Sequence, residues 1–170
     1  MNELLLKAIS YSLRKHAGQL RKDGRTPYAA HPMRVMSILA FEFGVKDPEV
    51  LAIAVLHDTI EDTTADRDDL EQFGRRVARA VATLSKDKRL PEERREFRYF
   101  KRLAKAPVET KLCKLADTLD NLIDAQSLPS EARRKTLAKA KELVKLFAPD
   151  FPKEWAHALD LVKERIKSAE

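Results

Sequence analysis

Cysteine and long apolar runs are nearly absent from this sequence. Its one cysteine, Cys113, cannot form an internal disulfide or supply a cysteine-rich zinc site, so the composition suits a reducing compartment. No apolar stretch approaches the roughly 20 residues that cross a bilayer. The apolar stretch within residues 1–15 is too short and too interrupted for a signal peptide. The sequence therefore predicts a soluble, cytoplasmic protein with no membrane partner.

Glycine, proline and aromatic residues are also scarce. The four glycines and eight prolines fall at breaks in the pattern, which excludes collagen-like and low-complexity chains. Hydrophobic residues make up 44% and charged residues 35%, a mixture too apolar for a disordered chain. A chain of 170 residues is about one domain in length.

The net charge of +6 is unevenly distributed. Residues 1–40 hold seven Lys and Arg against two acids, residues 58–71 hold seven acids against one Arg, and residues 86–105 hold nine Lys and Arg against four acids. A nucleic-acid groove favours a continuous basic stripe interleaved with aromatic residues, but aromatics here are only 6%. We therefore expect a small anionic substrate rather than nucleic acid. The basic segment 86–105 either screens the charge of that substrate or is a solvated face.

Helical periodicity runs through almost the whole chain. Apolar residues recur at three- and four-residue spacing, and the alternation typical of strands is hard to find. Asp47 and Pro48 form a start signal for a helix that is apolar nearly all round and should be central. We find no repeat and no linker, so the sequence predicts a single all-α domain, a helical bundle over residues 1–170. The expected helices lie around 4–13, 31–43, 48–60, 66–74, 75–85, 91–105, 107–125, 130–146 and from 152 onward.

The segment HDTIED at residues 57–62 places four ionisable side chains directly after the most apolar helix. On a continuous helix, His57 and Glu61 share a face, as do Asp58 and Asp62. Burial of so many charges is costly, and acids at a helix C-terminus oppose its dipole. A metal ion or a pocket for a charged ligand resolves these costs. The alternative is a helix that emerges into solvent with an acidic last turn.

Two other segments supply candidate ligands. His31 stands at a helix start, where a lone histidine is often only a cap or a packed side chain, and Asp117 borders a buried helical stripe, where a structural Asp is as common. Together with His57 and Asp58 they offer two imidazoles and two carboxylates. This nitrogen and oxygen set suits Mn²⁺, Fe²⁺, Zn²⁺ or Mg²⁺.

The order H…HD…D resembles that of HD-domain metal-dependent phosphohydrolases, and more closely the hydrolase domain of RelA/SpoT-type alarmone enzymes. The similarity rests on RKDGRTPYAAHP, LHDTIEDT, FG at 73–74 and KLADTLDN, a motif-bearing core at about 16–124; the C-terminal 129–170 shows only a helical pattern. The short length is similar to that of the stand-alone small alarmone hydrolases. The resemblance implies a fold of the HD type and removal of pyrophosphate from the 3′ position of (p)ppGpp, giving GDP or GTP.

The resemblance also carries roles to matching positions. Glu61 and Asp62 would be the catalytic acids beside the attacking water, and the chemistry suits them, since a divalent cation lowers the pKa of a bound water and a nearby carboxylate can orient it or transfer its proton. Which acid does which is left open. The metal, usually Mn²⁺ in this family, would be ligated by His31, His57, Asp58 and Asp117.

The substrate side of the site is expected to be basic. By resemblance, Arg21 and Lys22 would face the substrate phosphates and Asn121 would contact the nucleotide or its ribose. Arg25 in the same loop adds a third cation that could help to clamp a pyrophosphate, although the loop is equally readable as a solvated basic segment. Asp124 borders the nucleotide side.

Three positions depart from the pattern of the long bifunctional relatives. These usually carry Arg at the position of Thr118, an aromatic residue or His at that of Asp120, and often a hydroxyl at that of Asp124. The changes leave the metal chemistry intact and put the exact nucleotide specificity in doubt. Since no synthetase motif appears in the chain, we expect it to degrade the nucleotide and not to make it.

Two alternative functions stay open. One is an HD phosphohydrolase that acts on another nucleotide, such as ppApp or NADPH. The other is a non-enzymatic nucleotide or nucleic-acid binder, which has no need for a full ligand set with paired acids.

Overall fold

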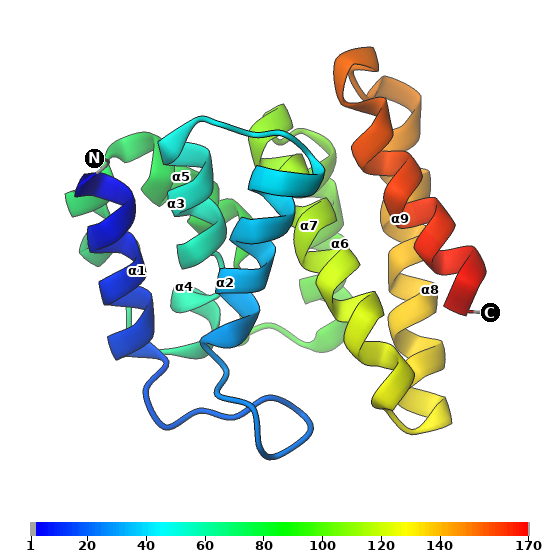
Figure 1. Cartoon of the computed structure of the whole chain (residues 1–170), viewed down its shortest axis with the longest axis horizontal. Coiled ribbons are helices and arrows are strands. Elements are labelled where there is room, and N and C mark those ends of the chain that lie inside the picture. The colour runs from blue at the N-terminus through cyan, green and yellow to red at the C-terminus, as the bar shows by residue number, and fades with distance from the viewer. Residues whose placement is uncertain (1–2, 170) are drawn as a thin grey trace.

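The computed structural model describes residues 3–169, and the described part of the chain is helical with no strand (Figure 1). One isolated antiparallel bridge joins Leu20 and Pro27 at the base of a loop. The predicted all-α class is confirmed. The elements in chain order are α1 (Glu3–Lys15), α2 (Ala30–Ser37), the π-helical η1 (Ile38–Glu42), α3 (Pro48–Leu56), α4 (Thr59–Asp62), the 3₁₀ turn η2 (Asp68–Phe73), α5 (Arg75–Leu84), α6 (Glu92–Ala104), α7 (Val108–Asp124), η3 (Ala125–Ser127), α8 (Ser130–Phe147), η4 (Ala148–Asp150), η5 (Lys153–Trp155) and α9 (Ala156–Ala169).

Helix α3 lies at the centre of the bundle, as its apolar sequence predicts. It packs against α1, α2, α5 and α7, and the side chains of Ile53 and Leu56 are completely buried. Burial of such a side chain contributes about 1.5–3 kcal/mol. Asp47 accepts a hydrogen bond from the backbone N–H of Glu49 at 2.9 Å, which caps the helix as expected. The end of this helix is therefore a rigid point in the fold.

The central helix ends earlier than its sequence predicts. The apolar pattern predicts a helix through Ile60, but α3 stops at Leu56, and a short separate helix, α4, begins at Thr59. Two side chains break it: His57 donates its Nδ1–H to the carbonyl of Ala54, and Thr59 donates its hydroxyl to the carbonyl of Leu56. Because side chains occupy these terminal carbonyls, the chain turns. His57 and Asp58 therefore lie in a turn, and the expectation that one continuous helix carries the 57–62 segment is wrong.

The C-terminal helices close one side of the bundle. Helix α9 packs against both α7 and α8, and α8 also contacts α6 and α7. In Figure 1, α8 and α9 stand next to α7, at the end of the molecule farthest from α1. This arrangement brings α8 to the edge of the space in front of α7. In residues 3–169, no helix is both long enough and apolar enough to cross a membrane.

Candidate metal centre and its cavity

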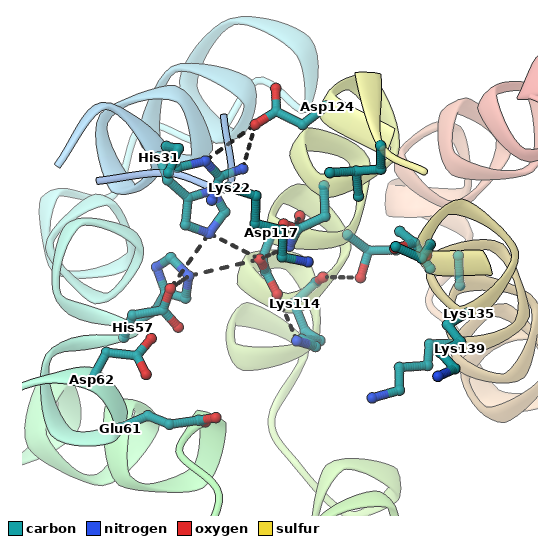
Figure 2. Close-up of a pocket in the computed structure, with 18 of the residues that line it drawn as sticks. Lys22, His31, His57, Glu61, Asp62, Lys114, Asp117, Asp124, Lys135 and Lys139 are labelled. Carbon is teal, nitrogen blue, oxygen red and sulfur yellow. Dashed lines mark hydrogen bonds and ion pairs between the residues drawn. The ribbon is translucent and has the colours of Figure 1, made fainter. Parts of the chain in front are cut away.

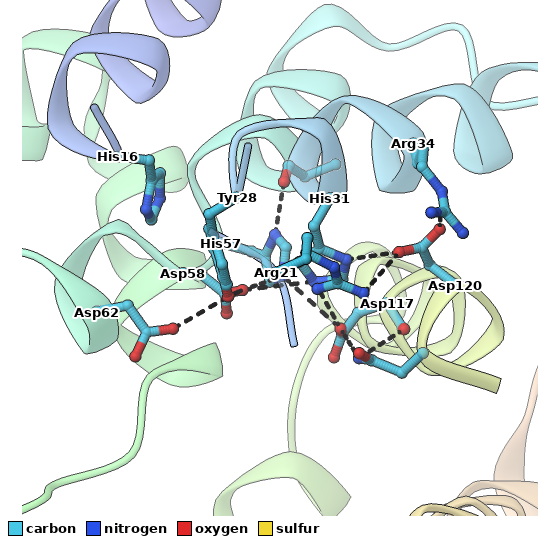
Figure 3. A network of polar contacts seen from close by, with 12 residues as sticks. His16, Arg21, Tyr28, His31, Arg34, His57, Asp58, Asp62, Asp117 and Asp120 are labelled. Atoms are coloured by element: carbon cyan, nitrogen blue, oxygen red, sulfur yellow. Dashed lines mark hydrogen bonds and ion pairs between the residues drawn. The ribbon is translucent and has the colours of Figure 1, made fainter. Parts of the chain in front are cut away.

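Three helical elements bring four ligand-type side chains together. His31 lies in the first turn of α2, His57 and Asp58 follow the end of α3, and Asp117 lies in the buried middle of α7. The Nε2 atom of His31 is 3.1 Å from Asp117 Oδ1 and 3.4 Å from Asp58 Oδ2. That of His57 is 3.0 Å from Asp58 Oδ2 and 3.8 Å from Asp117 Oδ1. The four side chains that the sequence pattern singled out thus converge on one point (Figures 2 and 3).

The orientation of the two imidazoles fits a cation at that point. His57 donates from Nδ1 to Ala54 O at 2.7 Å, and His31 donates from Nδ1 to Asp120 Oδ2 at 2.6 Å. A neutral imidazole that donates from Nδ1 offers a lone pair at Nε2. His57 Nε2 is buried and has no hydrogen-bond partner among the described residues. Two nitrogen lone pairs therefore face two carboxylate oxygens, which is repulsive unless a divalent cation or protons lie between them.

Protons fill that role when no cation is bound. Burial lowers the pKa of His31, but its hydrogen bonds with Asp117, Asp120 and Asp58 more than offset this and raise the pKa to about 11. Burial likewise lowers the pKa of His57, while the negative charges of Asp58 and Asp117 raise it to about 9. Such strong attraction for positive charge at a buried cluster is typical of a cation site.

The carboxylates of the cluster are held ionised. Burial alone would raise the pKa of Asp117, but the Lys114 ammonium and the two histidines hold it well below its usual range. Lys114 Nζ lies 2.5 Å from Asp117 Oδ2, and Asn121 donates to Asp117 Oδ1 at 2.6 Å. Asn121 therefore lies at the cluster and orients Asp117, besides lining the cavity described below.

Glu61 and Asp62 lie beside the cluster on the short helix α4. Glu61 Oε2 accepts a hydrogen bond from the backbone N–H of Lys86 at 2.9 Å. Burial and the neighbouring charges of Asp58 and Asp62 raise the pKa of Glu61. Asp62 Oδ1 is paired with Lys88 Nζ at 2.7 Å. The two acids thus have different environments, one in a partly buried position and the other in a surface ion pair.

The hydroxyl of Tyr28 contacts both Asp58 of the cluster and Asp62. Its hydroxyl lies 2.5 Å from Asp58 Oδ2 and 3.1 Å from Asp62 Oδ2, and its ring stacks against His16. Burial and the charge of Asp58 raise the pKa of Tyr28, so the hydroxyl stays a donor. The sequence leaves open whether Tyr28 packs on the nucleotide base or only on the protein. His16 is buried and lies outside the ligand cluster.

Four of the five substrate-side residues predicted from the sequence line the cavity, and one does not. Arg21 binds Asp124 Oδ2 through two nitrogens, at 2.5 and 3.1 Å, so these two candidates form a pair. The cavity next to the cluster is lined by Lys22, Arg21, Asn121 and Asp124. Of these four, Lys22 is exposed and the others are partly buried. Arg25 is exposed in the same loop and does not line the cavity.

The cavity in front of the cluster measures about 740 Å³, within the range of natural ligand pockets. One wall carries the cluster, Glu61 and Asp62, and the opposite wall is formed by α8, including Lys135 and Lys139 (Figure 2). The charged segment 86–105 lines the cavity with Lys86, Glu96, Tyr99 and Phe100, and none of its arginines reaches it. Helix α8 showed only a helical pattern in the sequence, and its lysines carried no signal that separates them from solvated ones.

Comparison with known proteins identifies the family of the chain. Residues 8–149 match the sequence profile of the HD domain. The chain is similar to the guanosine-3′,5′-bis(diphosphate) 3′-pyrophosphohydrolase MESH1 of Danio rerio, with 42% identity over 123 residues, which are 71% of this chain and 68% of that protein. MESH1 of Homo sapiens is 43% identical over 122 residues, with the same coverage. A GTP pyrophosphokinase, rsh of Brucella suis, is 38% identical over 157 residues, which are 88% of this chain and 20% of that protein.

Solved structures show the same fold. A structure described as a metazoan ortholog of SpoT that hydrolyzes ppGpp superposes with a TM-score of 0.87 at 31% identity, covering 99% of this chain and 96% of that one. The structure of lmo0812 from Listeria monocytogenes superposes with a TM-score of 0.65 at 27% identity, covering 83% and 96%. The chain therefore belongs to the HD-domain family, in the branch that includes the MESH1 proteins.

Proposed function

We propose that this protein removes the pyrophosphate group from the 3′ position of (p)ppGpp and releases GDP or GTP. The observation that carries the proposal is the convergence of two imidazoles and two carboxylates beside Glu61 and Asp62, in a cavity whose opposite wall carries Lys135 and Lys139. A nucleotide with diphosphates on both its 3′ and 5′ oxygens has two anionic ends, which match these two walls. The names of the MESH1 relatives describe this same reaction.

We propose Mn²⁺ as the resident cation, held by His31, His57, Asp58 and Asp117. A mixed set of two imidazoles and two carboxylates without sulfur suits Mn²⁺ better than Mg²⁺, which prefers oxygen ligands alone. When bound, a divalent cation polarises a phosphoryl oxygen and makes a coordinated water more acidic. The Nδ1 bonds of the two histidines orient the rings for this role.

Glu61 and Asp62 then accept and transfer the proton of the attacking water. Water attacks the phosphorus next to the ribose, a new P–O bond forms, the bond from phosphorus to the 3′ oxygen breaks, and that oxygen takes up a proton. A carboxylate can accept the proton of the water and return it to the leaving oxygen. Asp62 is fixed for this purpose by Tyr28 and Lys88.

The remaining wall of the cavity binds the rest of the nucleotide. We propose that Arg21 and Lys22 approach the phosphates from the loop, and that Asn121 and Asp124 border the nucleoside. Lys135 and Lys139 of α8 add positive charge on the opposite side. The HD-domain profile covers residues 8–149, and we propose that these residues degrade the nucleotide and do not make it.

A substrate panel with product identification tests the function. Protein stripped of metal and reloaded with Mn²⁺ is offered ppGpp, ppApp and NADPH, and we expect GDP and pyrophosphate from ppGpp. Asp58→Ala should abolish the reaction, whereas Asp160→Ala, which removes an exposed acid paired with Lys163 outside the cavity, should retain it. Turnover of ppApp or NADPH alone would assign the site to another nucleotide. No turnover with any substrate or metal would overturn the enzymatic proposal.

A further inference from the structure

Asp120 is a fully buried carboxylate that directly contacts a proposed metal ligand. Its Oδ2 atom accepts the Nδ1–H of His31 at 2.6 Å and lies 3.5 Å from the Arg21 guanidinium. Its Oδ1 atom lies 2.6 Å from Arg34 Nε. The side chain exposes nothing to solvent, and Figure 3 shows it between His31 and Arg34. Such a buried carboxylate is costly unless its partners compensate it.

Charge balance alone does not account for this position. Asp124 binds both of the same arginines, Arg21 at 2.5 Å and Arg34 at 2.9 Å. Only one of these two acids, Asp120, accepts a hydrogen bond from His31 Nδ1–H among the contacts of the described residues. The distinctive contact of Asp120 is therefore with the imidazole.

The position of His31 in its helix explains why it uses a side-chain acceptor. His57 follows the C-terminus of α3, where the carbonyl of Ala54 is free of helical partners and accepts the Nδ1–H. His31 lies in the first turn of α2, and the carbonyl three residues before it, that of Tyr28, already accepts the backbone N–H of His31. A carboxylate from α7 supplies the acceptor instead. Unlike a backbone carbonyl, it carries a negative charge.

We propose that Asp120 is a positioning residue that fixes the His31 ring with Nε2 toward the cation and strengthens cation binding through that ring. A carboxylate on the far nitrogen of a ligating imidazole sets its tautomer and raises its basicity as a ligand, and loss of such a partner typically weakens metal affinity about 10–100-fold. The inference rests on the proposed cation site.

Cation affinity of metal-stripped protein, measured by titration with Mn²⁺, tests this role. We expect Asp120→Ala to weaken Mn²⁺ binding about 10–100-fold. Asp120→Asn keeps an uncharged acceptor of nearly the same shape, so it should weaken binding roughly fivefold. The matched control is Asp124→Asn, which removes the negative charge that pairs with the same two arginines and leaves the His31 bond in place. It should bind Mn²⁺ within about twofold of the wild type.

Each outcome separates the explanations. If folded Asp120→Ala binds Mn²⁺ as tightly as the wild type, the proposed role of Asp120 is wrong. It is also wrong if Asp124→Asn loses as much Mn²⁺ affinity as the Asp120 variants, because the arginine network would then account for the loss. Circular dichroism checks folding, and if the Ala variant does not fold, an unchanged affinity in Asp120→Asn overturns the proposal. If wild-type protein takes up no Mn²⁺ or any other divalent cation, the proposed metal site itself fails, which is a different result.

Discussion

His57 donates its Nδ1–H to the backbone carbonyl of Ala54 at 2.7 Å, at the point where helix α3 ends. The same contact breaks the helix and aims Nε2 at Asp58 Oδ2, 3.0 Å away. The local structure and the proposed metal site thus have one cause. Because the acceptor is a backbone atom in the buried central helix, this ligand is held in place by the core.

Cation affinity should rise with pH. In the metal-free protein, despite burial, the carboxylates raise the pKa of His57 to about 9 and that of His31 to about 11. Both rings are therefore positively charged at neutral pH, with a proton on each nitrogen. A cation that binds at the two Nε2 atoms must displace one proton from each ring. We expect affinity to rise by up to about 100-fold per pH unit below pH 9. Calorimetry in buffers of different ionisation enthalpy near pH 7 should show release of about two protons, and release of none would contradict the proposed ligand set.

Glu61→Gln should separate metal binding from catalysis. Glu61 does not belong to the converging cluster, so the variant should bind Mn²⁺ normally while turnover falls by about 10²–10⁴-fold, the usual size of an acid–base contribution. Metal content and kcat are measured on the same sample. The matched control is Glu42→Gln at an exposed position. Loss of metal in Glu61→Gln would show that Glu61 is a ligand instead.

Tyr28→Phe should lower kcat with little effect on KM. The hydroxyl contacts both Asp58 and Asp62, and a hydrogen bond to a charged group contributes about 1.5–3 kcal/mol. We expect roughly a tenfold or greater loss of kcat with the fold intact. Steady-state kinetics on the Mn²⁺-loaded variant measure this, and an unchanged kcat would mean that Tyr28 only packs against His16.

Lys139→Ala should weaken substrate binding. Lys139 is exposed on the wall opposite the cluster, so its attraction for a polyphosphate is long-range and screened by salt. We expect KM to rise roughly fivefold at low salt, less at high salt, with kcat unchanged. Lys145→Ala changes an exposed lysine of the same helix that does not line the cavity and should leave KM unaffected. Equal KM values for the two variants would remove α8 from the substrate site.

The features that depend on short stretches of the sequence, such as the helices, could be predicted from it. Helical periodicity gave the all-α class, and the apolar run before His57 gave the central helix. The convergence of His31 with Asp117 could be expected only through the family pattern, because 86 positions separate them in the chain. The break after Leu56 was missed because it depends on two side-chain hydrogen bonds to backbone carbonyls, which periodicity does not register.

Contacts between distant helices lie beyond what the sequence shows. Asp120 follows a buried stripe in α7, but its bond to His31 depends on how α2 packs against α7. The helical pattern of α8 predicts that its lysines are exposed, and the structure agrees. The pattern does not show that two of them, Lys135 and Lys139, border the cavity. Both cases depend on tertiary packing, which sets the partner of each side chain.

The most direct test of the account is to measure bound Mn²⁺ and released pyrophosphate in one sample of protein supplied with ppGpp. We predict about one Mn²⁺ per chain, with pyrophosphate release that appears only when Mn²⁺ is restored. Both should be lost in His57→Ala and kept in His157→Ala, a histidine of α9 outside the cluster. Pyrophosphate release from metal-free protein, or from His57→Ala at the wild-type rate, would contradict the claim that this cluster is a catalytic cation site.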